Sequence, residues 1–192
     1  MAMTMDEIKH LLTTEGIKYF IAPDRPALLA GFGGVNGSYQ VLTLLELDGT
    51  FLQLRTIGWL HCPPDHPALT EVLKVVGEEN YRRRLVKIGW DPGDGELVAY
   101  ADVWIEDGAL TQQQFSRILH VYLPVTDMAY GRLKKTIETG HDPGERSLED
   151  MLGAVLEREG KGLPKKTRDL LKKLRRKGGP KGGEREDEDV YV

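Results

Sequence analysis

Apolar and polar residues follow two periods along this chain, and each change of period marks a predicted element. Apolar residues three or four positions apart indicate amphipathic helices, and strict alternation indicates half-buried strands. Thr4, with Glu7 three residues later, is typical of a helix start because the two side chains cap each other's backbone N–H groups. In chain order we predict a helix at 5–12, strands at 18–22, 39–47 and 51–57, a helix from 67 to 80–84, strands at 86–90 and 96–105, and a helix capped by Thr111.

Glycine and proline set the expected limits of these elements. Asp48-Gly49 predicts a type I′ hairpin turn, and the sequence DPGDG at 91–95 predicts the turn of a second hairpin. Three glycines weaken a strand prediction at 28–34. The glycine-rich stretch 31–37 precedes a strand pattern rather than a helix, so we interpret it as a strand connection and not as a phosphate cradle. Pro124 is expected to kink or break the last helix, with 127–139 continuing in a new direction.

The order helix, three strands, helix, two strands, helix predicts an α+β domain with an antiparallel sheet flanked by helices. Three features carry a family resemblance: Asn80 at the end of the second helix, the hairpin at 94–97 (DGEL), and DGALT at 107–111 before the last helix. Over about residues 4–139 the chain resembles the YbjN-like family of bacterial sensory transduction regulators. The resemblance implies a type III secretion chaperone-like fold that binds other proteins and pairs as a homodimer. It implies no established enzymatic activity, no catalytic residues and no cofactor.

The best candidate for a metal site is the stretch 61–66 (HCPPDH), because His, Cys and Asp side chains all bind zinc. The sequence holds no second cluster of comparable spacing, so the preferred interpretation is a loop before a helix, with Cys62 as a small apolar core residue. Whether His61, Cys62 and His66 bind a metal is left open. As the single cysteine, Cys62 has no partner for an internal disulfide, which fits a cytoplasmic location.

Three tryptophans are candidates for either packing or binding. Trp90 and Trp104 are expected on the two strands of the second hairpin, where packing in the core or on the sheet is favoured. Trp59 lies in a loop beside His61, and its role is the more open of the three.

Charge divides the chain into unlike parts. Residues 1–160 contain 15 Lys+Arg and 24 Asp+Glu, and residues 161–192 contain 11 and 6, which together give the net charge of −4. We predict a domain at 1–140, a short helical extension at 141–160, and a basic helix followed by a disordered acidic tail at 161–192. The candidate contact residues of the basic segment 165–177 are Lys165, Lys166, Lys172, Lys173, Arg175, Arg176 and Lys177.

These observations favour a cytoplasmic, non-enzymatic, protein-binding adaptor or chaperone-like regulator that forms a homodimer. The first alternative is weak, non-specific binding of nucleic acid or an anionic lipid surface through the basic segment, which has cations and leucines but no aromatic residue for base stacking. The second alternative is an enzyme whose active site forms only in the fold. No apolar run approaches the ~20 residues that a membrane-spanning helix needs.

Overall fold

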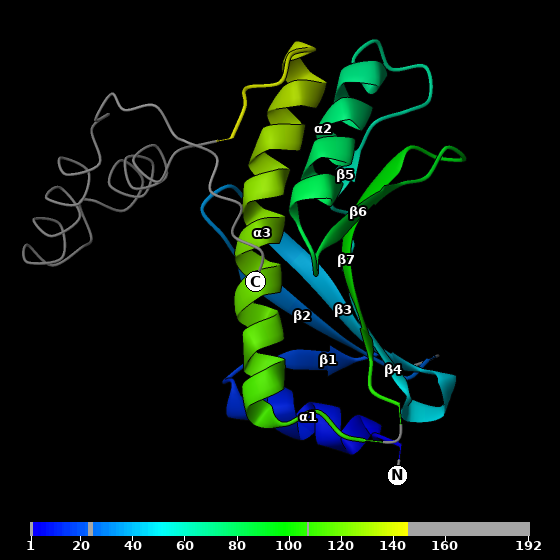
Figure 1. Cartoon of the computed structure of the whole chain (residues 1–192), viewed down its shortest axis with the longest axis vertical. Helices are drawn as coiled ribbons and strands as arrows, with labels where there is room; N and C mark the ends of the chain where they lie inside the picture. Colours follow the sequence, from blue (N-terminus) through cyan, green and yellow to red (C-terminus); the bar gives the residue numbers. More distant parts are fainter. Residues whose placement is uncertain (1, 23–24, 107, 146–192) are drawn as a thin grey trace, which may run out of the picture. The chain divides into compact units, whose positions relative to one another are not determined.

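The computed structural model describes residues 2–22, 25–106 and 108–145, which form a seven-stranded antiparallel sheet and three α-helices (Figure 1). The helices are α1 (Met5–Thr14), α2 (Leu69–Arg82) and α3 (Gln112–Thr139). The strands are β1 (Tyr19–Ile21), β2 (Ala27–Gly33), β3 (Ser38–Glu46), β4 (Phe51–Ile57), β5 (Leu60–His61), β6 (Lys87–Trp90) and β7 (Glu96–Trp104). The predicted α+β class, with an antiparallel sheet flanked by helices, is confirmed.

The long strand β7 joins the two parts of the sheet. The strand order is β1-β2-β3-β4-β7-β5, and β6 pairs with β7 from outside this path. The C-terminal half of β7 pairs with β4, from Phe51 opposite Trp104 to Arg55 opposite Tyr100. Its N-terminal half pairs with both β5 and β6. Three strands, β4, β5 and β6, therefore meet along β7.

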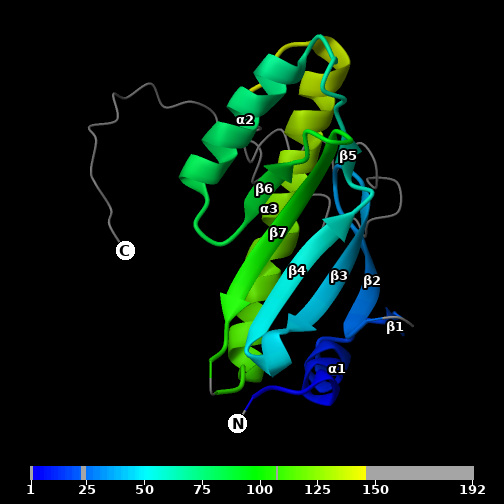
Figure 2. The ribbon, with the colours of Figure 1, turned by 90° about the vertical axis from the view of Figure 1, so that its right-hand side faces the viewer.

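One face of the sheet is buried against α3. Because side chains alternate across a strand, Leu52 and Leu54 of β4 share this face with Leu97 and Ala99 of β7, and all four are fully buried. Tyr122 of α3 is buried against them, and its hydroxyl donates to the backbone oxygen of Ala99 at 2.9 Å. Figure 2 shows the opposite side, where no helix of the described residues covers β4 and β7.

The two helix starts predicted from a capping threonine are confirmed at the level of individual atoms. Thr4 Oγ1 accepts from the backbone N–H of Glu7 at 3.3 Å, while the Glu7 carboxylate accepts from the Thr4 N–H at 2.7 Å. Thr111 and Gln114 form the same reciprocal capping box at the start of α3. The second helix differs, because it begins at Leu69 after Ala68 and not at Pro67.

The sheet has one strand that the sequence pattern predicts only weakly, β2, and one that it does not predict, β5. β2 forms despite its glycines, because all seven of its residues pair with β3 and three of them also pair with β1. Leu28 and Ala30 of β2 are buried in the folded protein. Pairing and packing of this strand therefore outweigh the low strand propensity of glycine. β5 lies inside the predicted proline-rich loop, where Leu60 and His61 pair with the start of β7.

The turn between β3 and β4 is longer than the predicted two-residue type I′ turn. The strands end their pairing at Glu46 opposite Phe51, so four residues connect them. Leu47, Asp48 and Gly49 all have positive φ angles of 49°, 55° and 88°. The backbone oxygen of Gly49 accepts from the N–H of Met3 at 3.1 Å, so the N-terminal segment holds this wider turn in place.

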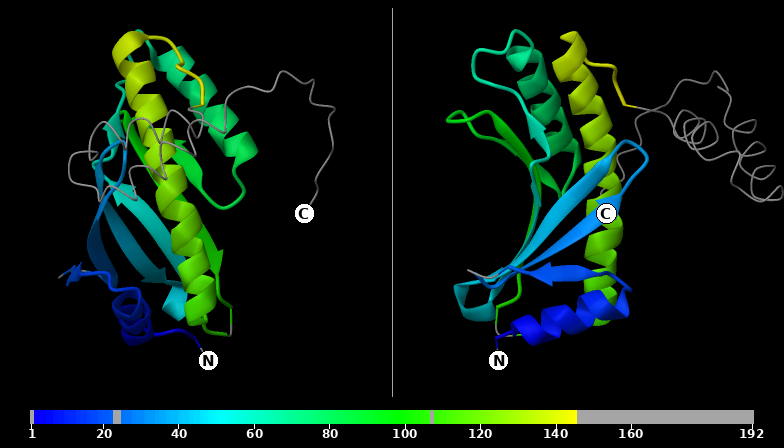
Figure 3. Two further views of the ribbon diagram at one scale, coloured as in Figure 1. Left: turned by 90° about the vertical axis from the view of Figure 1, so that its left-hand side faces the viewer. Right: turned by 180° about the vertical axis from the view of Figure 1, so that it is seen from behind.

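α3 runs unbroken through Pro124, contrary to the predicted break and change of direction. Figure 3 shows the helix as one element along the sheet. An interior proline loses one backbone hydrogen bond and costs ~3 kcal/mol in an isolated helix. Here Phe115 and Tyr122 before the proline, and Ala129 and Leu133 after it, are buried in the same core. Packing on both sides of Pro124 outweighs the local cost.

Candidate functional site

We name the side of β4 and β7 that no described helix covers the open face. It consists of the outward-pointing residues Phe51, Gln53 and Arg55 of β4 with Val98, Tyr100, Asp102 and Trp104 of β7. In register, Phe51 lies opposite Trp104, Gln53 opposite Asp102, and Arg55 opposite Tyr100. Each pair is close enough for its side chains to touch.

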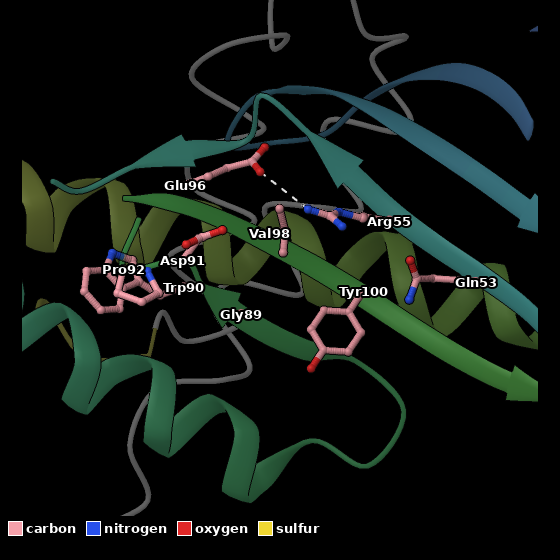
Figure 4. A pocket seen from close by; sticks show the side chains of 9 residues that line it. All are labelled: Gln53, Arg55, Gly89, Trp90, Asp91, Pro92, Glu96, Val98 and Tyr100. Carbon is pink, nitrogen blue, oxygen red and sulfur yellow. Dashed lines mark hydrogen bonds and ion pairs between the residues drawn. The ribbon is translucent and has the colours of Figure 1, made fainter. Parts of the chain in front are cut away.

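A pocket of about 440 Å³ lies at one end of the open face (Figure 4). Its lining residues are Gln53, Arg55, Gly89, Trp90, Asp91, Pro92, Glu96, Val98 and Tyr100. A single ion pair crosses it, from Arg55 to Glu96 at 3.5 Å. Both side chains are partly exposed, so this pair contributes little to stability. The pocket therefore combines an aromatic wall with one cation, Arg55, and two carboxylates, Asp91 and Glu96.

Trp90 closes this end of the pocket in a fixed orientation. Its indole Nε1 donates to the backbone oxygen of Cys62 at 2.9 Å. The ring thus packs between β6 and the segment after β5, as the sequence-based preference for packing predicts. Trp90 lies opposite Leu97 on β7 and not opposite Trp104, so the two tryptophans of the hairpin are not partners.

The other end of the open face carries an aromatic pair, in which Trp104 is exposed and Phe51 is half-buried. The rings of Phe51 and Trp104 lie 4.9 Å apart between centroids at an angle of 57°. Trp104 packs on the sheet as predicted, yet 63% of its surface is exposed. A large apolar side chain that is held by a neighbour and still faces solvent is typical of a binding surface.

Trp59 is excluded from any surface role by its burial. Only 5% of it is exposed, and its ring centroid lies 6.1 Å from that of Tyr130 in α3. Its Nε1 is buried without a hydrogen-bond partner in the described part of the chain.

The residues of the predicted metal candidate do not converge. Cys62 is fully buried, which confirms it as a core residue, and burial raises the pKa of its thiol. His61 is exposed and its Nε2 donates to the backbone oxygen of Asp94 at 2.6 Å. His66 Nδ1 accepts from the N–H of Ala68 at 3.2 Å. Within residues 2–22, 25–106 and 108–145, no three His, Cys, Asp or Glu side chains are arranged to hold a metal ion.

The glycine-rich turn between β2 and β3 binds a carboxylate from inside the protein. Asp127 of α3 accepts from the backbone N–H groups of Val35 and Asn36, both at 2.9 Å, and from the hydroxyl of Tyr39. The stretch is a strand connection, as predicted, but it also attaches to α3. Successive backbone N–H groups in a turn are a general anion-binding arrangement. No local sequence pattern predicts this contact, because about 90 residues separate its partners.

A buried charge network connects α2, α3 and the residues that follow α3. Arg132 is only 7% exposed and donates to Glu79 at 2.8 Å, to Glu78, and to both oxygens of Asp142. These bonds lower the pKa of the Asp142 carboxyl, with the hydrogen bonds from Arg132 as the largest cause. A fully satisfied network of this kind fixes the packing of helices. We assign it a structural role.

For the alternative that the protein is an enzyme, the described residues offer a candidate nucleophile–base pair, Ser116 and His120. Ser116 Oγ and His120 Nδ1 lie 3.2 Å apart on an exposed turn of α3. A nucleophile–base pair also needs a third group that orients the histidine. No hydrogen bond from His120 to a carboxylate occurs in the described residues.

The predicted contact residues of the basic segment, from Lys165 to Lys177, lie outside the described residues, as do most of the helical extension at 141–160 and all of the acidic tail. Their roles, and the domain boundary at residue 140, stay predictions. None of the helices that the structure describes is both long and apolar enough to cross a membrane.

Comparison with known proteins identifies one family, and the matching solved structures include YbjN from E. coli and a chaperone–effector complex. Residues 4–135 match the YbjN family model, which is described as "Putative bacterial sensory transduction regulator". The crystal structure of YbjN from E. coli, described as a putative transcription regulator, has a TM-score of 0.55 at 15% identity and covers 69% of this chain and 92% of its own. The HopA1–SchA chaperone–effector complex reaches a TM-score of 0.43 at 12% identity, covering 64% and 90%. No curated protein matches by sequence.

Proposed function

Because the chain belongs to the YbjN family, we propose that it is a non-enzymatic adaptor or chaperone-like regulator that binds a partner protein on its open face. The family description names a regulator and no reaction. The observation that carries the proposal is the exposed Trp104 ring, held against Phe51 on a sheet face that no described helix covers. A partner would bury this ring.

The composition of the open face supports protein binding over binding of a small polar molecule. Trp, Tyr and Arg are the side chains that most often dominate the energy of protein interfaces. Trp104, Tyr100 and Arg55 occur here within two neighbouring strands. The adjacent pocket has an aromatic wall of Trp90 and Tyr100, against which an apolar side chain of a bound partner can pack.

A capture experiment with the full-length protein as bait in native lysate tests whether a partner binds on the open face. Trp104→Ala and Tyr100→Ala should each abolish capture of the same partner. Tyr81→Ala is the matched control, because Tyr81 is 92% exposed on α2 and lies outside the open face. A partner that binds Trp104→Ala and wild type equally would refute the proposed site.

We propose that the chain also forms a homodimer, and that it does so through a different surface, the edge strand β1 of the described sheet. This three-residue strand ends the sheet and exposes 77% of Phe20 and 63% of Ile21. An exposed apolar edge strand is a template for pairing with a second copy. Light scattering at micromolar concentration should give a dimer for the wild type and a monomer for Phe20→Lys. A monomeric wild type would refute this assignment.

The basic segment 165–177 supports a second candidate function, which is weak binding of polyanions. It holds eight Lys and Arg within thirteen residues. Binding of single-stranded DNA or anionic vesicles should fall steeply with salt, as phosphate contacts do. Replacing Lys172, Lys173, Arg175 and Arg176 by Glu in the full chain should abolish it. Equal binding by this variant and the wild type would exclude the basic segment.

A further inference from the structure

The aromatic pair Phe51–Trp104 comes from two segments of the chain that carry negative charge and no positive charge. Residues 38–54 and 91–116, which include β3, the turn before β4, and β7, contain eight acidic residues and no lysine or arginine. The first cation beyond the former stretch is Arg55, which is paired with Glu96. The negative charge near Trp104 therefore lacks a nearby compensating cation from these segments.

Four of these carboxylates are placed around the aromatic pair. Glu46 lies directly opposite Phe51 in the β3–β4 register, and Asp102 lies two residues before Trp104 on the same face. Asp48 belongs to the adjoining turn. Glu106 follows β7, and its N–H donates to Thr50 in the same turn. All four are exposed, and within the described residues none forms an ion pair.

Asp102 is also held in position. Gln53 donates its side-chain amide to Asp102 at 2.7 Å across the two strands. The carboxylate therefore stays beside Trp104 at the sheet surface. A tryptophan face attracts cations through its ring quadrupole, and nearby carboxylates strengthen that attraction.

We propose that the open face selects a basic, extended segment of the partner protein, with an Arg or Lys side chain over Trp104 and an apolar side chain in the Tyr100 pocket. This inference rests on the proposed function and specifies the chemistry of its partner. A second copy of this chain is disfavoured here, because a two-fold interface would place Glu46 and Asp102 of both copies together.

The strand geometry sets the spacing of the two side chains. Tyr100 and Trp104 are four residues apart on β7, which corresponds to ~13 Å at ~3.3 Å per residue. A partner segment in extended conformation spans the same distance with four residues. The cation and the apolar side chain of the partner should therefore be separated by four positions and lie on one side of its chain.

The test is an NMR titration of ¹⁵N-labelled full-length protein with synthetic decapeptides of Ser and Thr. The probe peptide carries Arg at position 3 and Leu at position 7. The indole N–H signal of exposed Trp104, assigned with Trp104→Phe, should shift to saturation, while that of buried Trp59 should not move. Replacing Arg by Glu in the peptide should weaken binding about tenfold or more, which corresponds to ~1.4 kcal/mol. Moving Leu to position 6 should also weaken binding.

Protein variants supply the matched comparison. Asp102→Asn combined with Glu46→Gln should weaken binding of the arginine peptide several-fold and reduce its salt dependence. Glu138→Gln, an exposed carboxylate on α3, should change neither. Equal affinity for the arginine and glutamate peptides would overturn the inference, as would a Trp104 signal that shifts only with protein concentration. The proposed function fails by a different result, which is partner capture that is unaffected by Trp104→Ala.

Discussion

The side-chain amide of Asn80 forms hydrogen bonds with both backbone polar groups of Ile88. Its Nδ2 donates to the Ile88 oxygen at 2.9 Å, and its Oδ1 accepts from the Ile88 N–H at 2.7 Å. Asn80 is on α2 and Ile88 is on β6, so one residue fixes how the helix returns into the sheet. Because Ile88 also pairs with Ala99 of β7, the contact positions the strand that borders the pocket.

Asn80→Ala should destabilise the fold, because it leaves both backbone groups of Ile88 without these partners. Loss of a partner for a buried polar group costs ~1–3 kcal/mol. The midpoint of urea unfolding should fall accordingly. Tyr81→Ala at the next, exposed position should stay within ~0.5 kcal/mol of the wild type. Equal losses in the two variants would contradict the assigned role.

Asp127→Ala should release the turn between β2 and β3 from α3. The change removes the acceptor of the Val35 and Asn36 N–H groups and of the Tyr39 hydroxyl, which predicts a loss of ~2–4 kcal/mol. Asp127→Asn should lose less, because its side-chain oxygen still accepts. Hydrogen exchange of the Val35 and Asn36 amides measures the effect directly. Unchanged protection in the alanine variant would show that the turn is held by other contacts.

Comparing Gly49→Ala with Gly58→Ala distinguishes the cost of steric overlap from the cost of backbone strain. Both glycines have positive φ angles, of 88° and 55°, so alanine at either should cost ~1–2 kcal/mol. A Cβ at Gly49 would also overlap the backbone oxygen of Met3, whereas one at Gly58 would meet nothing within 4 Å. Thermal unfolding should therefore show the larger loss for Gly49→Ala. Similar losses of stability in the two variants would mean that the backbone at Met3 moves away from the new Cβ at little cost.

Asp142→Asn should reduce stability in a pH-dependent way. Hydrogen bonds from Arg132 lower the pKa of Asp142 below its ordinary value of about 3.8, so the ionised form stabilises the fold. This contribution is complete above the unfolded pKa and is lost as the pH falls through the folded pKa. The variant should be ~1.5–3 kcal/mol less stable at pH 7. The difference from the wild type should shrink below pH ~3.8, as measured by urea unfolding; a constant difference would contradict this.

Cys62 should react slowly with thiol reagents in the folded protein. The thiolate is the reactive form, and burial both raises the pKa of this thiol and blocks access. Labelling with a disulfide reagent at pH 8 should become fast only after addition of denaturant. Rapid labelling of the native protein would show that the segment after β5 opens readily.

Local chemistry explains why some elements could be predicted from the sequence. The two capping boxes depend on residues three positions apart, so Thr4 and Thr111 identify their helices directly. β2 could not be predicted in this way, because its strand form depends on pairing with β3 and on burial of Leu28. The unbroken helix at Pro124 could not be predicted for the same reason, since residues far along the chain pack against both halves of α3.

The candidate site shows the same division. The sequence places Trp104 on the second hairpin, but which side of the sheet it faces depends on its pairing with Phe51, 53 residues earlier. In the sequence, Asp127 has no feature that distinguishes it from other polar residues of a helix. Its role follows only from the contact with the turn at Val35 in the folded protein. The absence of Lys and Arg from 91–116 is visible in the sequence, yet it becomes informative only when the structure places Glu46 beside the same aromatic pair.

The pairing of β4 with β7 has a consequence for protein synthesis. β1 to β4 form a contiguous meander, but the next neighbour of β4 is made only when the ribosome reaches Trp104, 47 residues after Ile57. At ~5–20 residues per second, the edge of β4 stays unpaired for ~2–9 s. During that interval Leu52 and Leu54, fully buried in the finished protein, have no cover from β7 or α3. The nascent chain is then exposed to aggregation at this edge, and translation speed between residues 57 and 104 should influence the yield of folded protein.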